Sequence, residues 1–116
     1  MGRIWFASSH PWFAPSHGGL FMMDRRNNEI SSYRTDPNDK NSISSNNLRN
    51  VFVDRDHILW IGTNNSGLNI VDLDQPGDAY EFYQYLHDPN DTTSIYANYS
   101  CTFYQDGNKD LWIGGE

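Results

Sequence analysis

The sequence predicts an all-β fold of four-stranded antiparallel β-propeller blades, about two of them, forming a segment of a larger propeller. The first observation is an internal repeat at a spacing of 52 residues: Asp-Pro-Asn-Asp occurs at 36–39 and 88–91, and Leu-Trp-Ile-Gly at 59–62 and 111–114. A period of about 40 to 50 residues is typical of propellers and solenoids, whose units bury their apolar faces only against neighbours. The second observation is that apolar residues gather in short alternating segments, while no segment has the 3.6-residue apolar period of a helix.

The strands of a blade, lettered A to D in chain order, follow from aligning the repeats. Segments of about seven β-branched and aromatic residues end at Asp54 and Asp106, and each turn leads into a Leu-Trp-Ile strand. Gly107 and Asn108 in the second turn are residues that tolerate positive φ. We expect one domain over 1–116 with blade parts at 1–34, 48–86 and 100–116. The expected strands are B (3–7), C (19–24), D (29–34), A (48–54), B (58–63), C (67–73), D (80–86), A (100–105) and B (110–114).

One loop interrupts the repeat. Trp60 and Gly67 are seven residues apart, whereas Trp5 and Gly19 are fourteen apart, so the first B-to-C loop is longer by seven residues within 8–17. In an up-and-down blade the B-to-C and D-to-A loops lie at one end and the A-to-B and C-to-D turns at the other. The inserted loop and both Asp-Pro-Asn-Asp loops are therefore expected to share one face, here called the loop face (8–17, 36–47 and 88–98).

Composition excludes several classes of function. A net charge of −7 with only 8 Lys and Arg residues argues against nucleic-acid contact, which depends on neutralising phosphates. No apolar run reaches the roughly 18 residues of a membrane span, and the start of the chain lacks the pattern of a signal peptide. Cys101 is the single cysteine, so neither an internal disulfide nor a cysteine-based zinc cluster is expected. The mean hydropathy of −0.74 is low for a core that stands alone.

The residues at 43–54 and 59–63, followed by Gly67-Leu68-Asn69, resemble the two-component regulator propeller repeat. That motif reads as Ser and Asn, a strand, Asp, a glycine-containing turn and Leu-Trp-Ile-Gly-Thr. This sequence departs from it at His57, where the family usually has glycine, and at Gly115-Glu116, which replaces the usual Thr. The resemblance covers nearly the whole chain, and its motifs specify the blade rather than a ligand.

The resemblance implies a function. Similar repeats build seven-bladed propellers in the periplasmic sensor part of hybrid two-component regulators, often of Bacteroidetes, that sense oligosaccharides. The expected partners are an oligosaccharide or other small-molecule ligand, the neighbouring blades of the parent chain, and a second copy of the parent sensor in a homodimer. Kinase activity would belong to domains that are not in this chain. A free-standing, lectin-like carbohydrate-binding module that oligomerises to close the ring is the alternative.

The repeated aromatics and carboxylates have structural interpretations. Residues recurring in register in each blade are what interblade packing requires, although repeated tryptophans are also read as sugar platforms. The expected structural repeat residues are Trp5, Trp60, Gly62, Gly67, Trp112 and Gly114. Asp36, Asp39, Asp88 and Asp91 are expected to form turns rather than to bind calcium or to flank a glycosidic bond.

No catalytic, cofactor-binding or metal-binding residue is assigned, because the four histidines show no ligand spacing and no acid and base pair is visible. A propeller glycosidase or lyase is therefore the least favoured class. The inserted loop differs from the repeat because Trp12 and Phe13 lie between two prolines, where they would either stack on sugar rings or cover the adjoining blade. The candidate ligand-binding residues are His10, Trp12, Phe13, His17, Asn38 and Asn90.

Overall fold

A computed structural model describes residues 2–8, 19–64, 66–75, 80–94 and 102–114. These residues contain strands and no helix. The strands are β1 (Arg3–Ser8), β2 (Gly19–Asp24), β3 (Glu29–Tyr33), β4 (Leu48–Val53), β5 (Ile58–Thr63), β6 (Leu68–Asp72), β7 (Tyr83–Tyr85), β8 (Thr102–Gln105) and β9 (Leu111–Gly114).

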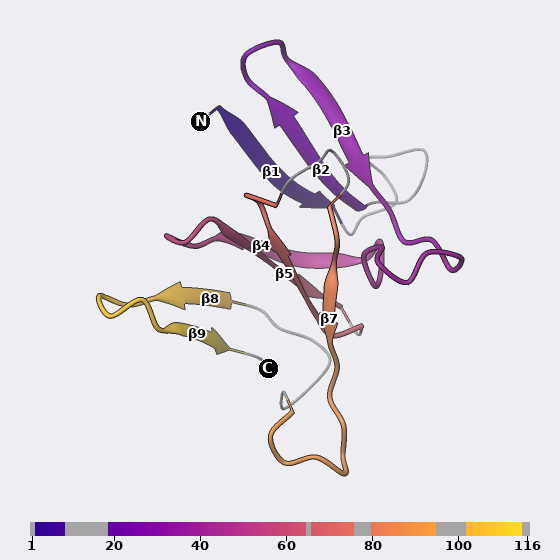
Figure 1. The fold of residues 1–116 in the computed structure, drawn as a ribbon, viewed down its shortest axis with the longest axis vertical. Helices are drawn as coiled ribbons and strands as arrows, with labels where there is room; N and C mark the ends of the chain where they lie inside the picture. Colours follow the sequence, from indigo (N-terminus) through magenta and orange to yellow (C-terminus); the bar gives the residue numbers. More distant parts are fainter. Residues whose placement is uncertain (1, 9–18, 65, 76–79, 95–101, 115–116) are drawn as a thin grey trace.

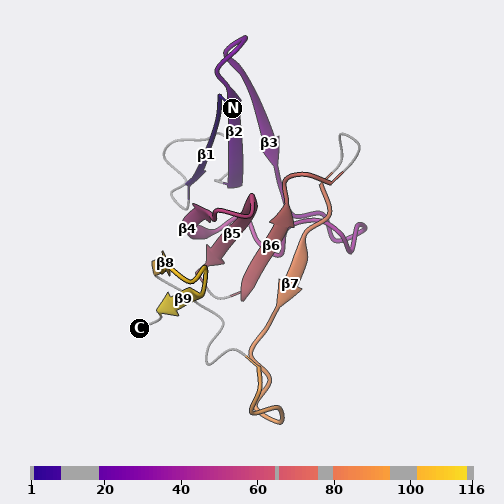
Figure 2. The ribbon, with the colours of Figure 1, turned by 60° about the vertical axis from the view of Figure 1, so that its left-hand side comes forward.

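Three antiparallel sheets form in chain order: β1-β2-β3, β4-β5-β6-β7 and β8-β9. Each strand pairs with the next along the chain, which is the up-and-down order of a propeller blade. The second sheet lies between the first sheet and the β8–β9 hairpin in both ribbon views (Figures 1 and 2). The predicted all-β blade architecture is confirmed, and the second sheet is a complete four-stranded blade.

The fourth strand of this blade is shorter than predicted. Strand β7 covers three residues, whereas 80–86 were expected. The backbone N–H of Phe82 donates to Asn41 O at 2.9 Å, in the loop before β4, and therefore does not extend the ladder with β6. The paired part begins one residue later, where Tyr83 lies opposite Ile70.

The register of the second blade gives it two apolar faces. Phe52, Trp60, Ile70 and Tyr83 lie opposite one another in successive strands and form one row. Because side chains alternate along a strand, neighbours such as Leu59 point to the opposite face. A strand with apolar residues on both faces is expected where a sheet is packed between two others.

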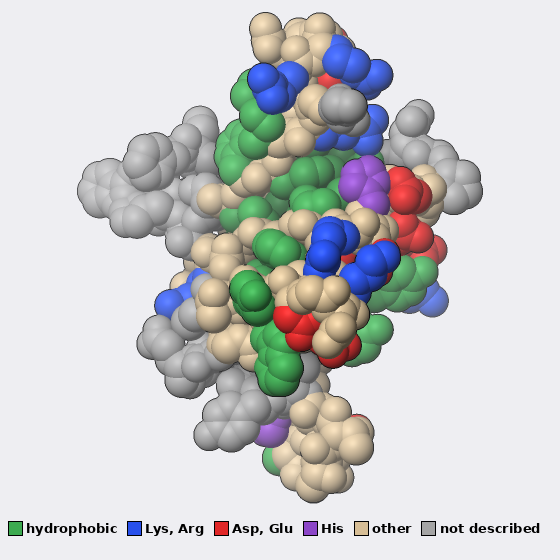
Figure 3. All heavy atoms as spheres, turned by 90° about the vertical axis from the view of Figure 1, so that its left-hand side faces the viewer, with side chains coloured by type: hydrophobic (Ala, Val, Ile, Leu, Met, Phe, Trp, Pro, Cys, Tyr) green, Lys and Arg blue, Asp and Glu red, His purple; other side chains and the backbone are tan. Residues whose placement is uncertain are grey.

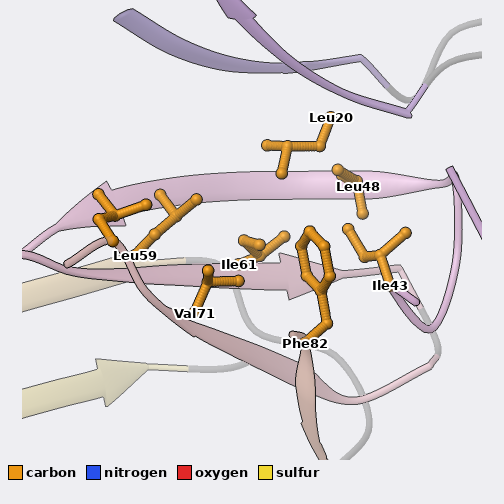
Figure 4. Close-up of a cluster of buried hydrophobic side chains, with 8 residues drawn as sticks. Leu20, Ile43, Leu48, Leu59, Ile61, Val71 and Phe82 are labelled. Carbon is orange, nitrogen blue, oxygen red and sulfur yellow. The ribbon is translucent and has the colours of Figure 1, made fainter. Parts of the chain in front are cut away.

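The core fills the space between the first two sheets. Leu59 and Ile61 of β5 are fully buried and pack with Leu20, which comes from β2 of the first sheet (Figure 4). Burying one such side chain stabilises the fold by about 1.5–3 kcal/mol. The complete core cluster is Leu20, Ile43, Leu48, Leu59, Ile61, Val71, Leu73 and Phe82.

Aromatic rings extend this packing. Trp5 of β1 lies 5.8 Å from both Tyr33 and Tyr80, measured between ring centroids, and Tyr33 and Tyr80 are 5.7 Å apart in an edge-to-face arrangement. Such pairs contribute about 0.5–1.5 kcal/mol beyond the area they bury. Since Tyr80 follows β6 and the other two rings come from the first sheet, this cluster joins neighbouring blades.

Fewer side chains join the second and third sheets than join the first and second. Phe52 and Phe103 stack with centroids 6.3 Å apart, and Arg55 donates to Gln105 Oε1 from its backbone N–H at 2.9 Å. Trp112 and Tyr104 remain 63% and 64% exposed on the hairpin. The end that carries the β4–β5 and β8–β9 turns shows basic and acidic side chains beside green apolar surface (Figure 3).

A left-handed residue precedes strand B in each blade. Gly2, His57 and Lys109 have φ values of 98°, 66° and 67°, and each lies three residues before the tryptophan of its strand. The positive φ in the last turn was expected near Gly107 or Asn108, but it lies at Lys109. Asp106 Oδ1 accepts the backbone N–H groups of Asn108 and Asp110, so the chain reverses at the residue between them. A left-handed conformation at this position also explains why glycine is usual where His57 stands.

Candidate functional site

The predicted ligand residues fall into two groups. His10, Trp12, Phe13 and His17 lie outside the described residues, so their contact with a ligand stays a prediction. Asn38 and Asn90 are exposed and occupy the same position in two loops of the same construction.

The first loop is closed by its own side chains. Asp36 Oδ1 accepts Asn38 N–H at 2.9 Å, and Asp39 Oδ1 accepts Asn41 N–H at 2.9 Å. The Ser42 hydroxyl donates to Asp39 O at 2.8 Å and lies 3.2 Å from Asp36 O, while it accepts Asp36 N–H at 3.0 Å. These bonds replace the pairing that a strand would provide, because short Asp and Ser side chains satisfy nearby backbone groups.

The second loop repeats the same pattern. Asp88 Oδ1 accepts Asn90 N–H at 2.9 Å, and the Ser94 hydroxyl accepts Asp88 N–H at 2.9 Å. Asp91 Oδ1 accepts both the hydroxyl and the N–H of Thr93, at 2.6 and 2.9 Å. These bonds hold the pKa of the Asp91 carboxyl below its ordinary value. In both loops the carboxylates stabilise the turn by accepting backbone N–H groups.

The loop before β4 is anchored to the second blade by a buried amide. Asn69 is fully buried; its Oδ1 accepts Ser44 N–H at 3.0 Å and its Nδ2 donates to Ser44 Oγ at 2.7 Å. The Ser44 hydroxyl donates in turn to Ser66 O at 2.9 Å. The sequence analysis assigned no role to Asn69. The signal that could have indicated one is a polar residue at a fixed place of the repeat motif, within an otherwise apolar strand.

A further hydrogen bond confirms that the B-to-C loop and the D-to-A loop before β4 lie at the same end of the second blade. Asn64 N–H donates to Asn47 O at 3.0 Å, which joins the loop after β5 to the loop before β4. The B-to-C and D-to-A loops of the second blade therefore meet at one end. Gly67, at the end of the B-to-C loop, has a φ of 81°.

A hollow of about 280 Å³ opens beside the first loop. Tyr33, Tyr80 and Phe82 supply its aromatic side. Asp39, Asn41 and Ser42 supply polar groups from the loop. Burial raises the pKa of the Tyr33 phenol, as does its neighbour Tyr80, while Arg3 opposes the shift. Aromatic surface bordered by a few fixed polar groups is the usual character of a small-molecule site.

The repeated tryptophans are held by aspartates. Trp60 Nε1–H donates to Asp54 Oδ2 at 2.8 Å, and Trp112 Nε1–H donates to Asp106 Oδ2 at 3.0 Å. In both blades the other carboxylate oxygen accepts backbone N–H groups of the A-to-B turn. The indole N–H is thus committed within the blade, which leaves only ring surface for any other partner.

The glycines of the repeat mark close approaches. A Cβ added at Gly67 would lie 2.4 Å from Tyr85 O, and one added at Gly114 would lie 2.9 Å from Thr102 Cγ2. Gly62 is buried opposite Leu68. At Gly67 and Gly114 an added side chain would therefore collide with the neighbouring strand.

Among the described residues, no group of three or more His, Cys, Asp or Glu side chains has the arrangement of a metal site. His57 Nδ1 lies 2.7 Å from Asp74 Oδ1 as an exposed pair. No helix in the described part of the chain has the length and apolar character needed to cross a membrane.

Comparison with known proteins identifies the repeat. Residues 42–65 match the family described as Two component regulator propeller, so the resemblance seen in the sequence is confirmed for this repeat. The matched segment contains β4, β5 and the turn that joins them. It also contains the aspartate clamp of Trp60 and the Ser44 anchor of the loop before β4.

Comparison with solved structures identifies the fold, and 11 chains match significantly. One is the extracellular domain assigned to the hybrid two component system BT3049 from B. thetaiotaomicron, with a TM-score of 0.75 and 23% sequence identity. The alignment covers 97% of this chain and 14% of that chain. No curated protein sequence gives a significant match. The chain thus has the fold of a short segment of a much longer propeller protein.

Proposed function

We propose that this chain, whose second blade carries the two-component regulator propeller repeat, is a ligand-sensing segment of a two-component signal-transduction sensor. The ligand is an oligosaccharide, and the segment lies outside the cytoplasmic membrane, in the periplasm. Kinase output belongs to other domains of the parent sensor, which acts as a homodimer. The match of 42–65 to the repeat family is the observation that carries this proposal.

The chemistry of the loop face supports an oligosaccharide. Sugars combine apolar ring faces with hydroxyls that need donors and acceptors. The hollow beside the first loop offers Tyr33 and Tyr80 together with Asp39 and Asn41. Asn38 and its counterpart Asn90 are presented by loops whose backbone is already hydrogen bonded, so their amides are available for contact without loss of the turn.

A binding function fits these carboxylates better than catalysis does. General acid and base catalysis needs carboxyl groups poised to exchange protons with a substrate. Asp36, Asp39, Asp88 and Asp91 each accept at least one backbone N–H of their own loop. Such bonds hold the carboxylates in fixed positions within their turns, which suits a structural role more than proton transfer.

The test uses full-length sensor protein and a panel of neutral and acidic oligosaccharides, with affinity measured by calorimetry. We expect binding of at least one oligosaccharide without its turnover. For that oligosaccharide, Trp12→Ala should lose roughly 1–3 kcal/mol of binding free energy, the contribution of one aromatic contact. Asn108→Ala, in the turn at the opposite end, is the matched control. Absence of binding across the panel would reject the proposed ligand class.

A free-standing lectin-like module is the second candidate, and the uncovered sheet faces are compatible with it. Ile30 and Phe6 on the first sheet and Tyr104 and Trp112 on the third are exposed apolar side chains, and other copies of the chain could cover them. Light scattering distinguishes the two candidates. A stable trimer or tetramer of the 116-residue chain would favour the module, and an aggregating or unfolded monomer would favour the sensor segment.

A further inference from the structure

A row of hollows lies between the first and second blades, and the hollow beside the first loop is one of them. Three hollows of about 290, 380 and 280 Å³ adjoin one another. The first and second share Arg3 and Leu73 as lining residues, and the second and third share Tyr33 and Tyr80. Together these neighbouring hollows are here called the interblade groove, which extends from the β4–β5 turn, with His57, to the loop before β4, with Asn41.

The wall of the interblade groove is aromatic. Trp5, Tyr33 and Tyr80 contact one another ring to ring, and all three line at least one of the hollows. They are half-buried rather than fully enclosed, so part of each ring surface faces the groove. Exposed ring faces held by other rings offer stacking surface with little rotamer entropy left to lose.

The charges of the groove are mainly basic, although the whole chain is acidic. Arg26 is neutralised by Asp24, with Nη2 and Oδ2 2.7 Å apart, and His57 is paired with Asp74. Arg3 differs in its hydrogen bond, because its Nη1 donates to the neutral Tyr80 hydroxyl at 2.9 Å, although its charge also acts on the Asp24 carboxylate opposite it in β2. A guanidinium carries five N–H donors, so one bond to a phenol leaves most of its donor capacity for another partner.

The polar groups at the far end come from the first loop. Asp39 Oδ1 accepts Asn41 N–H and Asn41 O accepts Phe82 N–H, which fixes both residues through their loop bonds. Both residues line the hollow beside the first loop. An amide and a carboxylate oxygen are suitable partners for sugar hydroxyls.

We propose that the interblade groove binds a linear acidic oligosaccharide of a few residues, with a sugar ring on Tyr33 and Tyr80 and a carboxylate on Arg3. Hydroxyls at the other end bond to Asn41 and Asp39. Arginine is the side chain best suited to a carboxylate because it can donate two parallel bonds. The inference rests on the proposed function, and it adds a specific place and a specific ligand charge to it.

The test compares trigalacturonate and trimannuronate with maltotriose, a neutral trisaccharide, on the full-length protein by calorimetry. An acidic trisaccharide should bind more tightly than maltotriose. Arg3→Gln should weaken its binding about tenfold or more, since a hydrogen bond to a charged group is worth about 1.5–3 kcal/mol. Tyr80→Ala should weaken it as well. Arg25→Gln removes the same charge from the exposed β2–β3 turn, which does not line the three hollows, and should leave affinity unchanged.

The outcomes separate the inference from the function it rests on. Binding of a neutral oligosaccharide alone, unaffected by Tyr80→Ala, would overturn the groove and leave the sensor proposal intact. If Trp12→Ala weakens the binding of an acidic trisaccharide and Arg3→Gln does not, the site lies on the inserted loop, and the proposed groove site is equally overturned. Failure of all neutral and acidic oligosaccharides would overturn both. Circular dichroism melting of each variant verifies that the fold is retained before affinities are compared.

Discussion

Replacing Gly67 by alanine tests the geometry at the start of β6. Gly67 has a φ of 81°, a conformation that costs an L-residue about 1–2 kcal/mol. The added Cβ would lie 2.4 Å from Tyr85 O and 2.7 Å from Leu86 Cδ2. The carbonyl belongs to the paired strand β7 and cannot move unless the two strands separate, so overpacking adds about 1–3 kcal/mol. We expect Gly67→Ala to lower the free energy of unfolding by more than about 3 kcal/mol.

The assay is urea unfolding of the full-length protein followed by tryptophan fluorescence, with a thermal melt as a second readout. A loss of this size should lower the melting temperature of the propeller by several degrees. Gly107→Ala is the matched control, because its Cβ meets nothing within 4 Å and its φ is not positive. The control should be neutral or stabilise by about 0.4–1 kcal/mol. If the two variants unfold at the same urea concentration, the reasoning from the Gly67 geometry is refuted.

Two further predictions concern the A-to-B turns. Lys109→Gly should raise stability by up to about 1 kcal/mol by removing a left-handed lysine, because the exposed pair with Asp56 that it also loses contributes little. His57→Gly likewise loses an exposed contact, with Asp74, and should show a gain of similar size; a lower melting temperature for Lys109→Gly would contradict this. The Trp112 indole N–H and the turn N–H groups lower the pKa of Asp106 below its ordinary 3.8. Its folded pKa is below its unfolded one, so its stabilisation is complete above the unfolded value and is lost as pH falls through the folded value. The urea midpoint should therefore drop on acidification more in the wild type than in Asp106→Asn, and equal slopes would refute the clamp as its source.

The blade architecture was predictable because each repeat of the sequence corresponds to the same set of strands and turns. The recurrence of Asp54 with Trp60 and of Asp106 with Trp112 reflects one hydrogen-bonded turn used twice, and a fixed spacing makes such a turn visible in sequence. Strand bounds followed from apolar alternation. The start of β7 was predicted too early because Phe82 is apolar and fits a strand pattern. Its backbone N–H instead donates to Asn41, in a loop that lies far earlier in the sequence.

The site was predictable only in part. Loop residues such as Asn38 could be assigned to a face, because loop position follows from strand order. The interblade groove could not be assigned, since Arg3 and Tyr80 are separated by 77 positions and meet only when two blades pack. The role of Asn69 was missed for a similar reason, because its partner Ser44 lies in the loop before the blade rather than in a strand.

The self-closing loops have a consequence for how recognition could diversify in a molecule of this kind. In each loop three side chains complete the turn: Asp36, Asp39 and Ser42 in the first, and Asp88, Asp91 and Ser94 in the second. The two positions before the serine carry different residues in the two copies, Lys40-Asn41 in one and Thr92-Thr93 in the other. Substitution there can alter the surface of one blade while its neighbours keep theirs, so a ring of blades can acquire a new specificity one blade at a time.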